Sequence, residues 1–316
     1  MKILMCYPQS FEWEETGRFI HESFKKKGHE VFVFDDIRME QLFDRSKMNQ
    51  MLIKKYEKVM PDVFFMLKSE GIYPSTLDFI KCKKLYWHPD VRKKVQDWVV
   101  SKALKCDKFF TMSKGSVPEY KEKGVDVHYL PEACDPNYHY HIPDSELSDY
   151  YKCPVKFIGT VRNERIPMLQ RLAWEKIPFR VWGNFDNKLF AYPEILKNHT
   201  RTCLWGEAHS FAASSGINIT WDWCPKVELS YSARIYRVMA SQGVYLCKYV
   251  KGMEKVFTKG THCDWFNTLE EMTDKIKYYI ENPSRMDVVG KAAQKEVYNK
   301  HTFDLRVSKM IEVMDK

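Results

Sequence analysis

The stretch FIGTVRNER, residues 157–165, closes an apolar run with a glycine and then turns basic. The run VKFIGT, residues 155–160, is typical of a buried strand, and ERIPMLQRLAWEK, residues 164–176, is typical of a helix. Gly159 lets the backbone approach a ligand closely, and the free N–H groups at the start of a helix favour an anion. Arg162 and Arg165 can add charge-assisted hydrogen bonds to a phosphate. The stretch therefore predicts an anion site at a strand-to-helix turn, with a solvated basic turn as the alternative.

The same alternation of strands and helices extends in both directions from this turn. Towards the C-terminus, strands are expected at 179–184, 217–220 and 244–249, and helices near 268–281, 284–299 and 303–315. Towards the N-terminus, a helix is expected at 14–27, and strands at 2–7, 31–36, 63–67, 84–88, 108–112 and 127–131. Such alternation predicts parallel sheets with right-handed crossovers. Residues 134–152 contain two prolines and show no clear period, so they are interpreted as a linker between two α/β units.

Composition limits the classes of protein. A length of 316 residues suits two domains, and 44% hydrophobic with 29% charged residues is ordinary for a soluble globular chain. No apolar run approaches the roughly 18 residues of a membrane span, and MKILMCYPQSF lacks a signal-peptide layout, so we expect a cytoplasmic protein. Nine cysteines without any CxxC pair favour reduced thiols, and we expect neither a metal nor a cofactor. The net charge of +8 suits an anionic partner, or solubility alone.

The loops that follow the strands are where a parallel sheet binds ligands. The first strand is followed by PQSFEWEETG, so a GxGxxG fingerprint is missing there, and the chain has no Walker A motif. Asp35 and Asp36, after the second strand, are therefore interpreted as helix N-caps and not as ribose ligands. The turn YWHPD, residues 86–90, places His88 and Asp90 at a predicted strand end, where either can serve as a general base. The alternative is a capping aspartate beside a packed histidine.

The stretch SARIYRVMASQG, residues 232–243, predicts a helix that stops at Gly243. The three-residue spacing places Arg234 and Arg237 on one face of it. Two guanidinium groups on a helix under a binding crevice are unusual unless a ligand carries negative charge.

Several stretches, in a fixed order, resemble the CgeB-like glycosyltransferases, a family of the GT-B group similar to the group-1 transferases. The resemblance rests on FIGTVRNER, FRVWGN, ARIYRVMASQG, GMEKVFTKG and the tail from NTLEEM through YYIENP to HTFDLR, preceded by TMSKGSVPEYKEKG and YLPEACDP. It runs from about Lys84 to the end, and over residues 1–83 only the order of strands and helices agrees. It implies an α/β GT-B fold of two Rossmann-like domains facing across a cleft. The acceptor domain would span 1–140, the nucleotide-sugar domain 152–300, and a last helix, 302–316, would pack back on the first.

The resemblance also implies which residues meet a nucleotide-sugar donor such as a UDP-sugar. The family usually has a glutamate, which accepts bonds from the donor ribose, where this chain has Arg237. Arginine cannot accept a hydrogen bond, but it can pair with phosphate bidentately, so Arg234 and Arg237 are interpreted as a phosphate pair. The donor nucleotide and the stereochemical outcome stay open. The implied donor-binding residues are Gly159, Thr160, Arg162 and Arg165 at the diphosphate, Gly183 and Asn184 near the nucleobase, and Ser232, Arg234, Tyr236 and Arg237 on the helix.

In the implied reaction, an acceptor hydroxyl attacks the anomeric carbon and a nucleoside diphosphate leaves. GT-B enzymes as a group usually need no catalytic metal. Asp90 is our first choice as base, His88 the second and Glu14 the third.

The acceptor is open. Family members act in spore or cell-surface glycosylation, related proteins occur in bacteriophages, and phage GT-B enzymes can place sugars on hydroxymethylated pyrimidines in DNA. The charge of +8, the basic stretches 54–58, 81–84 and 92–94, and nearby Trp87 and Trp98 favour duplex DNA, although solvated helix faces explain them equally. Three further hypotheses compete with a DNA-modifying enzyme: a surface-glycan or protein glycosyltransferase, a non-catalytic nucleotide-sugar or DNA-binding module, and an epimerase.

Overall fold

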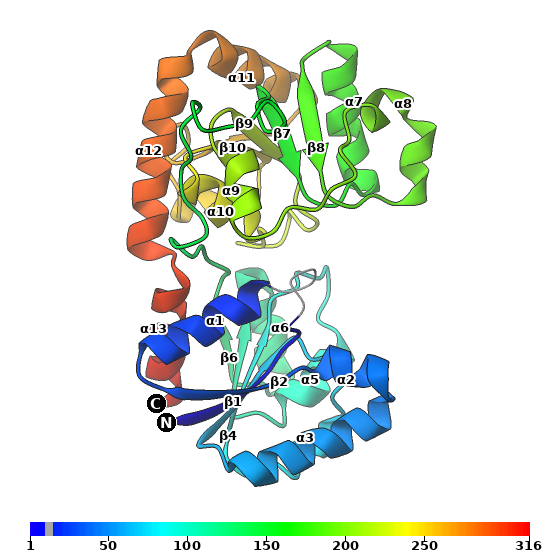
Figure 1. The fold of residues 1–316 in the computed structure, drawn as a ribbon, viewed down its shortest axis with the longest axis vertical. Helices are drawn as coiled ribbons and strands as arrows, with labels where there is room; N and C mark the ends of the chain where they lie inside the picture. Colours follow the sequence, from blue (N-terminus) through cyan, green and yellow to red (C-terminus); the bar gives the residue numbers. More distant parts are fainter. Residues whose placement is uncertain (10–14) are drawn as a thin grey trace. The chain divides into compact units, whose positions relative to one another are not determined.

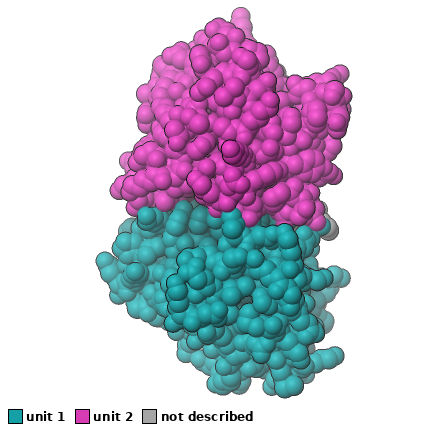
Figure 2. All heavy atoms as spheres, turned by 90° about the vertical axis from the view of Figure 1, so that its left-hand side faces the viewer, with its two compact units in different colours: residues 1–132, 303–316 teal, residues 133–302 magenta. Residues whose placement is uncertain are grey.

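The computed structural model describes residues 1–9 and 15–316, which form two compact units (Figure 1, Figure 2). Unit 1 comprises Met1–Glu132 and Phe303–Lys316, and unit 2 comprises Ala133–Thr302. Residues 133–140, which we had expected in the first domain, therefore belong to unit 2. The hydroxyl of Ser210 holds them to unit 2: its Oγ donates to Tyr138 O (2.8 Å) and accepts from Tyr140 N (3.3 Å).

Unit 1 is built on a six-stranded sheet in which all neighbouring strands are parallel. The strand order is β2-β1-β3-β4-β5-β6, so the chain changes its winding direction between β1 and β3. The strands are apolar because helices cover the sheet; β3, for example, is buried along its whole length. The strands are β1 (Lys2–Cys6), β2 (Glu30–Phe34), β3 (Val63–Leu67), β4 (Lys83–His88), β5 (Lys108–Thr111) and β6 (Val127–Tyr129).

The helices of unit 1 include the last helix of the chain. The Phe19 ring in α1 lies 5.2 Å, between centroids, from the Phe303 ring in α13. The side chain of Asp35 accepts a hydrogen bond from Arg38 N (3.0 Å), so its predicted role as an N-cap is confirmed. The helices are α1 (Glu15–Lys26), α2 (Asp36–Leu42), α3 (Arg45–Val59), α4 (Pro74–Leu77), α5 (Asp97–Ala103), η1 (Lys114–Ser116), α6 (Val117–Glu122) and α13 (Phe303–Met314).

Unit 2 is built on a five-stranded parallel sheet of order β11-β10-β9-β7-β8. Winding reverses between β7 and β9, and ligands of open α/β sheets bind at such a switch point. The strands are β7 (Val155–Ile158), β8 (Phe179–Trp182), β9 (Ile217–Thr220), β10 (Val244–Lys248) and β11 (Asp264–Phe266). The helices are η2 (Asn163–Arg165), α7 (Ile166–Trp174), η3 (Asn187–Ala191), α8 (Pro193–Leu196), α9 (Glu207–Ala213), α10 (Arg234–Ala240), η4 (Met253–Lys255), α11 (Leu269–Glu281) and α12 (Pro283–Lys300).

The two parallel sheets with flanking helices confirm the predicted α/β class. The predicted glycine stop of α10 is wrong in its mechanism. Gln242 takes the left-handed conformation (φ 58°), while Gly243 is not among the residues with positive φ. A Cβ on Gly243 would collide with the carbonyl oxygen of Ala213, so close packing explains this glycine. No helix in the described part of the chain is long and apolar enough to cross a bilayer.

Candidate active site

A cavity of about 360 Å³ lies in unit 2, where the loops after β7 and β8 meet the start of α10. This is the switch point of the sheet. Nine of the ten residues predicted to bind a donor line it: Gly159, Thr160, Arg162, Arg165, Gly183, Asn184, Ser232, Arg234 and Arg237.

Two glycines let the backbone of the cavity pack closely. Gly159 has φ 145° and Gly183 has φ 135°, conformations that other residues rarely adopt. A Cβ on Gly183 would lie 2.5 Å from the carbonyl carbon of Gly159, and a Cβ on Gly159 would collide with the Arg234 guanidinium. Glycine is therefore required at both positions by the fold of the cavity itself.

Arg165 and Arg234 are held by oxygen atoms of the surrounding loops. Arg165 Nε donates to Trp221 O (3.0 Å), and its Nη1 donates to Thr160 O. Arg234 Nε donates to Ile158 O at the end of β7 (2.5 Å), and its Nη1 donates to Thr220 Oγ1. These bonds fix the orientation of both guanidinium groups at the cavity wall.

The charge of these arginines is poorly balanced. The guanidinium carbons of Arg165 and Arg234 both lie 5.4 Å from the centroid of the buried Phe157 ring, so both cations pack against the same aromatic side chain. Burial, and then repulsion by Arg234, lowers the pKa of Arg165 to about 10. The nearest carboxylate, that of Asp222, stands 4.0 Å from Arg234, and none of the described residues that line the cavity is acidic. The cavity is therefore suited to a ligand with more than one negative charge.

Unsatisfied donors add to this preference. Neither η2 nor α7 has a side-chain N-cap; Arg165 N and Ile166 N donate to backbone oxygens of the turn, which leaves the N–H groups of Asn163 and Glu164, at the start of η2, to an anion. The Oγ atom of Ser232 is buried in the cavity wall without a hydrogen-bond partner among the described residues.

His209 lies in the cavity wall, although nothing in the sequence indicated it. It is 4% exposed on α9, and its Nδ1 has no hydrogen-bond partner in the described part of the chain. Burial, followed by the charges of Arg237 and Arg234, lowers its pKa well below the ordinary value, so the imidazole is neutral at pH 7. No motif surrounds this histidine, and only the packing of α9 against α10 brings it to the arginines.

The segment after α8 was also missed. It pairs with the edge of β8: Val181 N donates to Asn198 O (2.9 Å), and Gly183 N donates to Thr202 O (2.8 Å). This pairing carries the next residues to the cavity, where Cys203, Leu204 and Trp205 join Trp182 in its lining. RTCLWGE has no strand or helix period that could have indicated this role.

Tyr236 does not line the cavity. It is fully buried on the other side of α10, where its ring lies 5.1 Å from the His301 ring and 6.0 Å from the Tyr231 ring. Packing in this aromatic cluster explains the residue, and Tyr236 is left out of the proposed donor site.

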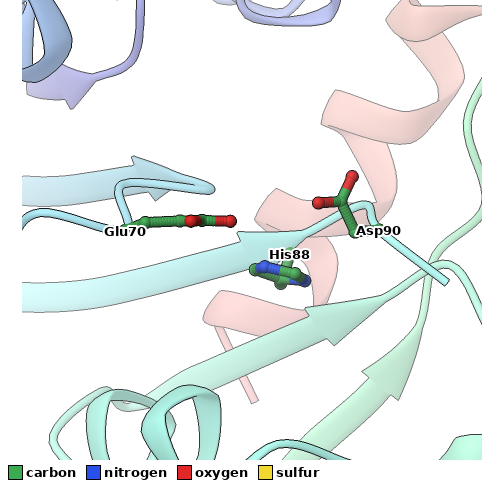
Figure 3. Close-up of side chains that lie close together, drawn as sticks. All are labelled: Glu70, His88 and Asp90. Carbon is green, nitrogen blue, oxygen red and sulfur yellow. The ribbon is translucent and has the colours of Figure 1, made fainter. Parts of the chain in front are cut away.

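In unit 1, His88 and Asp90 lie at the carboxyl end of β4 together with Glu70 from the loop after β3 (Figure 3). One potential ligand atom from each of the three lies within 4.8 Å of the others. The two carboxylates are paired with cations: Asp90 with Lys68 and Arg92 (3.6 Å each), and Glu70 with Arg92 (3.8 Å).

The three candidate bases differ in environment. Burial, with smaller effects from Lys68 and Arg92 that Asp90 opposes, lowers the pKa of His88 to about 4. The imidazole packs edge-on against Trp98, at 5.3 Å between centroids. The Asp90 side chain is 35% exposed and accessible to a substrate. Glu14 lies outside the described residues.

Comparisons with known proteins agree with this geometry. Residues 162–312 match the family model described as glycosyl transferase-like. A search of curated protein sequences finds no significant match. Together with the fold, the family match confirms the resemblance to GT-B glycosyltransferases.

Solved structures are similar over the whole chain. HepE from Anabaena, in complex with UDP and glucose, superposes with a TM-score of 0.74 at 11% identity, over 100% of this chain and 99% of that one. An α-glucosyltransferase bound to UDP-glucose and to DNA with an abasic site gives 0.72 at 11%, over 100% of both chains. Sucrose-phosphate synthase from Thermosynechococcus elongatus gives 0.68 at 10%, over 99% and 98%.

Proposed function

We propose that this GT-B glycosyltransferase moves a sugar from a UDP-sugar to a hydroxyl group of hydroxymethylated pyrimidine in duplex DNA. The main support for a UDP-sugar donor is the cavity of unit 2. Four arginines line it, and none of its described lining residues is acidic. Arg165 and Arg234 are already oriented by backbone oxygens, so a diphosphate would find them in place. Negative charge grows on the leaving phosphate during transfer, and preorganised guanidinium groups stabilise that charge.

Asp90 is the proposed base. The acceptor oxygen forms a bond to the anomeric carbon, the bond between that carbon and the β-phosphate oxygen breaks, and the hydroxyl proton passes to Asp90. Its ion pairs with Lys68 and Arg92 orient the carboxylate. His88 is a poorer candidate because its imidazole is buried and packs against Trp98, whereas the Asp90 side chain is 35% exposed and within reach of an acceptor hydroxyl.

Two observations support DNA as the acceptor: the net charge of this chain and the ligands of a similarly folded enzyme. The net charge is +8, and a similarly folded α-glucosyltransferase binds UDP-glucose and DNA. The expectation that Trp87 lies near a bound base is wrong, because Trp87 is fully buried in β4 and cannot stack on one. Trp98 is partly buried against His88 and Lys102.

The test is sugar transfer measured by mass spectrometry. Duplexes with and without 5-hydroxymethylcytosine are incubated with a panel of UDP-sugars and wild-type protein. We expect the mass of one sugar per modified base with one donor, and none on the unmodified duplex. Asp90→Asn should lower this turnover by roughly 10²–10⁴ and leave UDP affinity unchanged.

Three results would change the proposal. If the wild-type protein releases UDP from a donor but modifies neither duplex, the acceptor is not DNA and a surface-glycan acceptor takes its place. If no donor is turned over while UDP still binds, the chain is a non-catalytic nucleotide-sugar module. Wild-type turnover in Asp90→Asn would remove Asp90 as the base.

A further inference from the structure

A second cavity, of about 540 Å³, lies in unit 1 between α2 and α3, beside the edge strand β2. Its floor is apolar and includes Phe34, Met39 and Met51. Four basic side chains stand around it: Arg38 from α2, and Lys54, Lys55 and Lys58 from α3.

The charges of these four side chains have no partner among the described acidic residues. None of them takes part in an ion pair with another residue of the described chain. Asp35, the acidic residue of the lining, instead accepts hydrogen bonds from backbone N–H groups, one of them that of Arg38 (3.0 Å). The groove therefore carries a concentrated positive charge.

The other two basic stretches of unit 1 differ in this respect. Lys81 and Lys84 donate to backbone carbonyls of their own turn, those of Asp78 (2.6 Å) and Ile80 (3.0 Å). Arg92 is paired with Asp90 and Glu70. The stretch 54–58 instead presents Lys54, Lys55 and Lys58 to the cavity, and none of the three has an ion pair with a described residue.

We propose that the α2–α3 groove binds the phosphodiester backbone of duplex DNA, which makes it a docking surface for the proposed acceptor and rests on that proposed function. Lys54 and Lys58 are one helical turn apart, about 6 Å along the axis. This is close to the rise of two nucleotides along one strand, about 6.8 Å. A concave basic surface fits the convex edge of a duplex, whereas an anionic bilayer presents a flat surface to a protein.

The test compares two double variants by fluorescence anisotropy with a labelled duplex. Lys54→Ala/Lys58→Ala removes two groove cations. Lys291→Ala/Lys295→Ala is the matched control: it removes two exposed lysines, also four apart, from α12 of unit 2, where neither has an ion pair with a described residue. Thermal unfolding followed by circular dichroism, measured in parallel, reports whether both units of each variant are folded.

The measured quantity is the slope of log affinity against log salt concentration. Each phosphate neutralised contributes about −0.9, so the groove variant should lose about 1.8 from the magnitude of the wild-type slope and the control should lose none. Equal slopes for the two variants would overturn the proposal. So would a groove variant that binds anionic lipid vesicles more weakly but binds DNA as well as the wild type.

The two proposals fail separately. If the salt slope of the groove variant is reduced but the wild-type protein transfers no sugar to hydroxymethylcytosine, the groove still binds DNA and the proposed acceptor is wrong. If the wild-type protein transfers sugar to hydroxymethylcytosine but the groove variant has the wild-type salt slope, the acceptor proposal holds and the groove is not a DNA-binding surface.

Discussion

Replacing Arg234 by alanine tests the donor cavity most directly. The substitution removes the guanidinium that is bonded to Ile158 O and Thr220 Oγ1 and that stands 4.0 Å from Asp222. A hydrogen bond from a charged group to a phosphate contributes about 1.5–3 kcal/mol, so the dissociation constant for UDP should rise by roughly 10- to 160-fold.

This change in affinity can also be measured as a change in stability. At a UDP concentration 100 times the wild-type dissociation constant, UDP stabilises the wild-type protein by about 2.7 kcal/mol. For Arg234→Ala the same concentration should give only about 1.3 kcal/mol at the low end of the range and about 0.3 kcal/mol at the high end. Without UDP, the variant also loses its bonds to β7 and β9, while Arg165 is relieved of a neighbouring charge that lowers its pKa.

Titration calorimetry gives the dissociation constant, and urea unfolding with and without UDP gives the stabilisation. Arg171→Ala is the control, because Arg171 is in the same unit, is paired with Glu175 (3.1 Å) and does not line the cavity. Wild-type UDP affinity in Arg234→Ala would refute the phosphate role. A similar loss in both variants would indicate a general effect on the fold of unit 2.

Two further predictions concern stability. Gly183→Ala should lower the melting temperature well below that of Gly260→Ala. The new Cβ at position 183 would collide with the Gly159 carbonyl group, whereas a Cβ at position 260 has nothing within 4 Å. Equal melting temperatures would contradict the packing of the cavity backbone. Burial raises the pKa of Asp36 to about 7 from its ordinary value of 3.8. Between these two pH values the folded state retains a proton that the unfolded chain has lost, so the free energy of unfolding falls as the pH rises from about 4 to 7. Asp36→Asn should therefore be more stable than wild type in urea unfolding at pH 8 and lose this advantage near pH 4; a pH-independent difference would show that burial does not shift this carboxyl.

Much of the fold could be predicted because hydrophobic periodicity is a local property. The apolar runs at β1, β3 and β9 and the helical period at α11 are each visible within a few residues. The short strand β11 was missed because three residues, Asp264–Phe266, carry too little pattern. The acidic cap at Asp35 could be predicted because capping involves residues only three apart.

The candidate site was predictable only in part. The glycines and arginines after β7 and on α10 follow from the turn chemistry and from the family resemblance, and they do line one cavity. Tyr236 was placed in the donor site by the family resemblance alone, whereas the structure packs it against Tyr231 and His301 and not in the cavity wall. His209 and Trp205 belong to segments without a motif, and contacts across many residues of chain bring them to the site.

The sequence by itself determined the α/β class, the position of the basic strand-to-helix turn after β7 and the net positive charge, since these depend on residue type and short spacing alone. The tertiary structure decided which charges keep a partner. Lys84 donates to a backbone carbonyl and Arg92 pairs with Asp90, whereas Lys54 and Lys58, in a similar basic stretch, line a cavity and have no ion pair with a described residue. Whether a charge is paired depends on side chains that folding brings within a few ångströms, so it is settled when the elements pack and cannot be read from their order.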